Sequence, residues 1–191
     1  MTAPTPTPAD GTPTGAVVSD ARDELVASTG AQSSPGQGAW SPQRGEAFWY
    51  LGGKVRVLLT GEDTGGTLSV LEFTDPVGHA PPMHLHEREA ETWTVLEGKV
   101  MVVVDGARHE IGQGEAVYSP LGTVHSYLVR SPSARLIATY VPAGIERHFI
   151  ENGAPITEGS EEPAPFDIDA VATSINGYGV RLAGPPPTLE D

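Results

Sequence analysis

Short runs of β-branched and aromatic residues, divided by Gly, Pro and Asp, fill the chain between Phe48 and Tyr140. Runs of this kind, separated by turn residues, are typical of an all-β sandwich or barrel. Gly98 and Asp105-Gly106 predict tight turns, since Asp-Gly is a strong signal for a two-residue hairpin. We predict strands over residues 47–51, 54–60, 67–73, 83–86, 91–97, 99–104, 107–111, 116–119, 125–130 and 135–141. Such short strands favour a small closed jelly-roll barrel, whose mouth is a place where polar groups can converge.

Flanking segments of different composition surround this all-β region. The chain has 191 residues, 38% of them hydrophobic, which suits one domain with a sizeable core. Residues 1–40 are a Thr/Pro-rich tail that we expect to be disordered, with a short helix fitting residues 19–28. Residues 41–142 form the predicted barrel. Residues 143–191 are expected to pack on it as helical and extended segments, with short helices near residues 145–149 and 167–174.

Charge and composition exclude several classes of function. The formal net charge of -14 would repel an extended phosphate backbone, so we expect no nucleic-acid partner. The absence of cysteine excludes disulfide bonds, thiolate metal sites and a cysteine nucleophile. We see no secretion signal and no apolar stretch long enough to cross a bilayer, and therefore expect a soluble, cytoplasmic protein without a membrane partner.

Three histidines and one glutamate have the spacing of a metal site. His84 and His86 are two residues apart on a predicted strand, so their side chains point to the same face. Glu91 opens the next strand, where it shares a face with Trp93, and His125 opens a later strand. If the histidines point inward, all four groups meet inside the barrel.

Nitrogen and oxygen ligands of this kind suit a divalent transition metal. Two or three imidazoles with one carboxylate fit Fe, Ni, Mn, Co, Cu or Zn, and the ligand set does not choose among these ions. A site that keeps open coordination positions can bind water or substrate, whereas a closed four-ligand cage is structural. The sequence therefore predicts one divalent metal cofactor.

The spacing around these residues resembles the two signatures of the cupin superfamily. The first resemblance lies in Gly78, His84, His86, Glu91 and Gly98, separated by five, one, four and six residues. The second lies in Gly114, Pro120, Gly122 and His125, separated by five, one and two residues. The second signature normally ends with Asn, where this chain has Val129. That departure affects a turn and no ligand.

Other segments resemble single-domain cupins similar to bacterial quercetin 2,3-dioxygenases. They cover roughly residues 45–188 and comprise 48–53, 61–66, 144–149, 178–180 and 184–186. The resemblance implies a metal held by His84, His86, Glu91 and His125, O2 as co-substrate, and Glu91 as the catalytic base. It also implies a small-molecule substrate and, since cupins commonly pair through sheet edges, a homodimer.

Several further residues are candidates for contact with a substrate. Trp93, Met101, Tyr118 and Tyr127 lie on predicted barrel strands, where they either line a cavity for an aromatic ligand or simply pack in the core. Tyr127 shares the face of His125 and is the first choice for a polar contact. His148 lies on the predicted helix after the barrel, where a solvated position and a role beside the site are both open.

Three functions remain open from the sequence. The first is a metal-dependent dioxygenase that oxidises an enolisable aromatic or flavonol-type substrate with O2. The second is a metal-dependent isomerase, cyclase or lyase that acts on a small metabolite without O2. The third is a cupin that binds a ligand without catalysis, because a fold does not settle a function.

Overall fold

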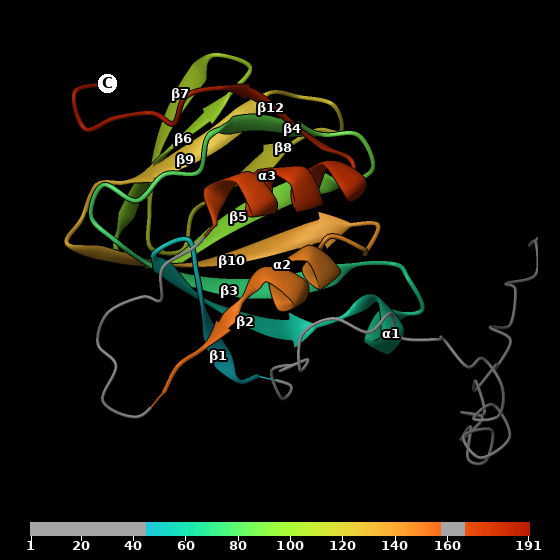
Figure 1. Ribbon diagram of the computed structural model, residues 1–191. Coiled ribbons are helices and arrows are strands. Elements are labelled where there is room, and N and C mark those ends of the chain that lie inside the picture. The colour runs from blue at the N-terminus through green and yellow to red at the C-terminus, as the bar shows by residue number, and fades with distance from the viewer. Residues whose placement is uncertain (1–44, 158–166) are drawn as a thin grey trace, which may run out of the picture. The chain divides into compact units, whose positions relative to one another are not determined.

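The described part of the structure, a computed structural model, comprises residues 45–157 and 167–191. Its elements form two antiparallel sheets with three short helices (Figure 1). The predicted all-β jelly-roll class is confirmed for this part of the chain. The Thr/Pro-rich tail and the helix expected over residues 19–28 lie outside the described residues.

The larger sheet has seven strands. The order is β11 (Ala154–Pro155), β1 (Ala47–Tyr50), β2 (Gly53–Leu59), β3 (Ser69–Pro76), β10 (Ser133–Val141), β5 (Ala90–Glu97) and β8 (Ala116–Ser119). The smaller sheet runs β12 (Val180–Gly184), β4 (Met83–His86), β9 (His125–Val129), β6 (Lys99–Val104) and β7 (Ala107–Gly112). All ten predicted strands are present, and β11 and β12 are additional.

Two of the turns show why the chain has glycine there. Asp105 and Gly106 both have positive φ, 49° and 77°, as the two-residue turn between β6 and β7 requires. Gly98, between β5 and β6, has a φ of 86°, and a Cβ at this position would lie 2.4 Å from the carbonyl oxygen of Ser133. A side chain at Gly98 would therefore clash with the backbone of a neighbouring strand, and its positive φ would also be strained for any residue other than glycine.

Three helices are present in the described residues: α1 (Gly61–Thr64), α2 (Glu146–Asn152) and α3 (Ile168–Gly177). Thr60 begins α1 with a capping box that Asp63 completes, and Asp167 begins α3 by accepting a hydrogen bond from the Ala170 amide. Helices α2 and α3 contact one another beside the strands (Figure 1). Both were predicted, although each extends beyond its expected end.

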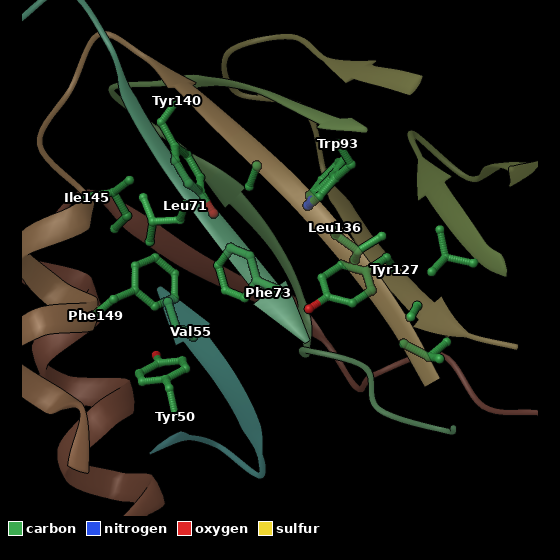
Figure 2. Packing of buried hydrophobic residues seen from close by; sticks show 14 of the residues in the cluster. Tyr50, Val55, Leu71, Phe73, Trp93, Tyr127, Leu136, Tyr140, Ile145 and Phe149 are labelled. Carbon is green, nitrogen blue, oxygen red and sulfur yellow. The ribbon is translucent and has the colours of Figure 1, made fainter. Parts of the chain in front are cut away.

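The core lies between the sheets and follows a period of two along several strands, whereas all five residues of β9 are buried. In β10, for example, Leu136, Ala138 and Tyr140 are buried, whereas the residues between them are partly exposed. Figure 2 shows Tyr50, Ile145 and Phe149 gathered beside the helices, with Trp93 and Tyr127 farther along the strands. The aromatic side chains of the core thus extend from the helices into the sheets.

None of the helices among the described residues combines the length and the apolar character needed to cross a membrane.

Candidate metal centre

The four predicted ligands come together. Strand β4 supplies His84 and His86, β5 supplies Glu91, and β9 supplies His125. One donor atom from each lies within 4.8 Å of the others. His84 pairs directly with His125 across the two strands, which explains why residues 41 positions apart reach one point.

The distances around Glu91 describe the shape of this cluster. Its Oε2 atom lies 3.2 Å from Nε2 of His125 and 3.5 Å from Nε2 of His86. The imidazole centroid of His84 is 4.4 Å from that of His125, and the rings of His86 and His125 are stacked at 5.3 Å. Glu91, His86 and His125 are buried, with 3%, 4% and 1% of their surface exposed.

Each imidazole uses its Nδ1 atom for another partner. His84 Nδ1 donates to the Pro82 carbonyl at 2.8 Å, and His125 Nδ1 donates to the Thr123 carbonyl at the same distance. His86 Nδ1 lies 3.3 Å from the carboxylate of Glu89. Such contacts fix the ring and its tautomer, and they leave Nε2 with a lone pair for a metal ion.

Two buried polar atoms support the fit to a metal. Glu91 Oε2 and His125 Nε2 have no hydrogen-bond partner among the described residues. A buried polar atom without a partner costs about 1–3 kcal/mol, so such atoms in a folded protein call for an explanation. A cation bound between them would satisfy both, and the nitrogen and oxygen donors are those a divalent transition metal accepts.

The protonation states agree with this interpretation. Burial, and then the nearby His125 and His86, lower the pKa of His84 to about 3, so the ring is neutral near pH 7. Burial by itself would raise the pKa of Glu91, but contact with His125 and the charge of His86 outweigh it, and the pKa lies below its usual value. Neutral imidazole and ionised carboxylate are the forms that bind a metal.

A cavity of about 140 Å³ opens directly beside the cluster. His84, His86 and Glu91 form one part of its wall, and helices α2 and α3 form another. The remaining lining is mainly aromatic and aliphatic and comprises Tyr50, Leu51, Phe73, Pro81, Pro82, Trp93, Tyr127, Tyr140, Ile145, Phe149, Val171, Ala172, Ile175 and Leu182. The candidate metal centre thus faces a partly enclosed and largely apolar space.

Two of the predicted substrate contacts lie at this cavity. Trp93 and Tyr127 both line it, and the Trp93 ring lies 5.0 Å from that of His125. His148 is buried behind the wall, where Nε2 lies 2.7 Å from the hydroxyl of Tyr50. That these residues contact a substrate stays a prediction.

Met101 and Tyr118 lie elsewhere, and both departures come from the face of the strand. On β6, Val102 pairs with Tyr127 on the inner face, so Met101 and its partner Leu128 belong to the outer face and to a separate cluster. Tyr118 on β8 is 60% exposed. Of the two alternatives stated for these residues, Met101 takes packing in the core and Tyr118 takes neither, and neither side chain lines the cavity.

Some residues of the site carried no recognised sequence signal. Glu89 contacts His86, and Ser119 contacts His125, with Ser119 Oγ 2.8 Å from His125 Nδ1. Ser119 is brought opposite Glu91 by the pairing of β5 with β8, which the sequence alone does not give. Glu89 lies in the turn between β4 and β5, where strand alternation gives no direction for a side chain.

Comparison with known proteins supports the same assignment. Residues 71–142 match the model of the cupin domain family. The chain is 29% identical over 121 residues to quercetin 2,3-dioxygenase of Bacillus subtilis, a match that covers 62% of this chain and 36% of that protein. It is also 29% identical over 119 residues to the dimethylsulfoniopropionate lyase DddW of Ruegeria pomeroyi, with 61% of this chain and 72% of that protein covered.

Other relatives share a shorter region. The match to mannose-1-phosphate guanylyltransferase of Escherichia coli is 33% identical over 63 residues, covering 33% of this chain and 13% of that protein. The chain thus spans about a third or less of the length of the first two curated relatives.

Solved structures with a similar arrangement include KdgF from a Halomonas species, with a TM-score of 0.47 and 19% identity over 51% of this chain and 87% of that one. An RmlC-like cupin from Shewanella frigidimarina has a TM-score of 0.45 and 22% identity over 62% of this chain and 96% of that one. Residues 71–142, which contain all four candidate ligands, thus match the cupin domain family, and the chain resembles bacterial quercetin 2,3-dioxygenase over 121 residues.

Proposed function

We propose that the protein is a metal-dependent oxidoreductase of the quercetinase-like kind, which oxidises an enolisable aromatic substrate with O2. The observation that carries this proposal is the meeting of three imidazoles and one carboxylate at the wall of a partly enclosed, mainly apolar cavity. The similarity to the Bacillus subtilis dioxygenase supports the use of O2. Fe, Ni, Mn, Co, Cu and Zn all suit the ligands.

The chemistry divides among the residues of the site. His84, His86, Glu91 and His125 would hold the ion, which would supply Lewis acidity and open coordination positions for a substrate oxygen. Glu91 is ionised near neutral pH and faces the same point, so it is the group to accept a hydroxyl proton. The aromatic and aliphatic walls exclude water and orient the substrate.

A second candidate is a metal-dependent lyase that does not consume O2. The similarity to the dimethylsulfoniopropionate lyase, of which 72% is covered, favours it. The cavity also presents Trp93 and three tyrosines, whose ring faces can attract a cationic ligand such as a sulfonium. Both candidates need the same metal and the same ligands, so the role of O2 separates them.

The test begins with elemental analysis of freshly purified protein, followed by O2 uptake with flavonols and single-ring catechols. The proposal expects a divalent transition metal near one equivalent and substrate-dependent O2 consumption. His86→Ala should lose metal and activity together. Glu87→Ala is the control, because Glu87 is exposed and pairs with Arg181 away from the cluster.

Three outcomes count against this function. Turnover under nitrogen at the aerobic rate would favour the lyase candidate. Tight ligand binding with no product under any of the six metals would favour a binding protein. Full activity of metal-free protein would contradict both metal-dependent proposals.

A further inference from the structure

We propose that the cavity selects a substrate with a single ring that carries adjacent oxygens, and discriminates against flavonols with three rings. The inference rests on the proposed metal-dependent function and specifies its substrate class. Its basis is the size of the cavity, the position of the ligands in its wall, and the lack of free polar groups elsewhere in that wall.

Size is the first argument. The cavity measures about 140 Å³. An engineered protein cavity of about 150 Å³ holds one benzene molecule, which sets the scale for one aromatic ring. A flavonol adds a fused ring and a third, attached ring to that volume, and close-packed walls do not yield such space without cost.

The walls that limit the cavity are well packed. Phe149 of α2 contacts Tyr50 and Phe73 with ring centroids 4.9 and 5.4 Å away. Val171 of α3 and Ile145 are buried in the same core cluster. The part of the wall that Phe149, Ile145 and Val171 form is therefore part of the hydrophobic core.

Orientation follows from where polar atoms remain. The Tyr127 hydroxyl donates to Asp75 at 2.6 Å, and the Tyr50 hydroxyl is hydrogen-bonded to His148 at 2.7 Å. The lining contains no lysine or arginine among the described residues, so an anionic substituent on the ring would have no partner there. The substrate's oxygens must then face His84, His86 and Glu91, with the apolar edge of the ring against the helices.

Helix α3 offers substitutions that change the size of the cavity in both directions. Ile175 and Ala172 line the cavity and are only partly buried, so changing them perturbs the core less than changing Phe149. Ile175→Ala enlarges the space and Ala172→Phe fills it. Ala170→Phe is the matched control, because Ala170 lies on the same helix, is exposed and is absent from the lining.

The experiment measures binding rather than turnover. Full-length protein is loaded with Zn²⁺ and titrated under nitrogen with catechol, which has one ring, and with quercetin, which has three, by isothermal titration calorimetry. We expect catechol to bind about tenfold more tightly than quercetin, and Ile175→Ala to reduce that ratio several-fold. Ala172→Phe should weaken catechol binding by about tenfold or more with unchanged zinc content, whereas Ala170→Phe should not.

The remaining outcomes separate this inference from the proposed function. Quercetin binding as tightly as catechol overturns the inference, as does failure of both probes to bind zinc-loaded protein, or an equal effect of Ala172→Phe and Ala170→Phe. O2 consumption with quercetin alone would leave the dioxygenase proposal standing and overturn the size selection. Catechol preference without any O2 consumption would leave the size selection standing and overturn the dioxygenase proposal.

Discussion

At the scale of single residues, the histidines of the metal centre differ in what holds their Nδ1 atoms. His84 and His125 donate to backbone carbonyls, which a side-chain substitution does not remove. His86 depends instead on the carboxylate of Glu89, whose exposed fraction is 3%. A buried carboxylate beside a ligating histidine fixes its tautomer and makes it a stronger donor.

Glu89→Gln should therefore weaken the metal site without removing a ligand. The amide keeps the size of the side chain but loses the negative charge beside His86, and we expect about tenfold lower affinity for a divalent metal. Competition with a chelator of known affinity measures the change. Glu87→Gln, an exposed carboxylate two positions away, should leave the affinity within about twofold, and an equal loss in both variants would refute the role of Glu89.

His148 supplies a prediction about pH. Burial lowers its pKa from 6.5 to about 4, so between these values the unfolded chain binds a proton that the folded chain does not. Stability is then fully present above about pH 6.5 and falls as the pH approaches 4. His148→Gln, compared with wild type in EDTA by urea unfolding from pH 7 to 4, should lose about 2 kcal/mol less over this range.

Only the pH dependence is diagnostic for His148, since Gln also changes the hydrogen bonds to Tyr50 and Ser174 at every pH. A uniform loss of stability with parallel pH profiles would show that His148 does not titrate in the way inferred. Ser174→Ala is the control: it removes the neighbouring hydroxyl and keeps the imidazole, so its pH profile should follow wild type.

At the scale of strands and turns, two glycines test whether crowding adds to backbone strain. Gly98 and Gly106 have similar positive φ values, 86° and 77°, and both turn a hairpin of β6. A Cβ on Gly106 would meet nothing within 4 Å, whereas on Gly98 it would lie 2.4 Å from the Ser133 carbonyl oxygen and 2.9 Å from Ala134 Cα. The two sites share the conformational cost and differ in the steric one.

Gly106→Ala should lower the free energy of unfolding by about 1–2 kcal/mol, the cost of a left-handed conformation for an L-residue. Gly98→Ala should cost clearly more, about 3 kcal/mol or above, because backbone atoms must also move. Equilibrium unfolding in urea of both variants measures the difference. Equal losses would mean that the β5–β6 turn relaxes without cost.

The sequence predicts those elements whose conformation is determined by their own residues, and it misses those that depend on pairing with a distant strand. The ten strands follow from composition and from a period of two, which also puts His84 and His86 on one face of any strand. That Glu91 and His125 join them at one metal site is what the cupin resemblance implied. Met101 shows the limit of that period: alternation groups Met101 with Val103, but only pairing with β9 decides which group faces inward. Strand β12 was missed because it lies between glycines, Gly179 before it and Gly184 at its end. It becomes a strand by pairing with β4, which is far away in sequence.

At the scale of the whole molecule, the last strand, β12, pairs with β4, the strand that carries His84 and His86. Strand β4 pairs with β9 through one register position, His84 with His125. On its other side it pairs with β12 through four, among them Val180 with His86 and Leu182 with His84. The Glu87 amide also donates to the Gly179 carbonyl at 2.8 Å. A segment nearly a hundred residues away thus fixes the direction of both imidazoles.

Deleting residues 179–191 should therefore weaken metal binding although every ligand remains in the chain. Without β12, the backbone groups of β4 on that side lose their partners, and His84 and His86 gain freedom that binding must remove again. Deleting only residues 187–191 retains β12 and the hydrogen bond from Met83 to the Pro185 carbonyl, and serves as the control. Chelator competition and thermal unfolding with and without metal should show a loss of affinity above about tenfold, and a smaller metal-induced rise in Tm, for the longer deletion alone. Equal affinity in both truncated proteins would mean that β9 and the turn at Glu89 suffice to orient the ligands.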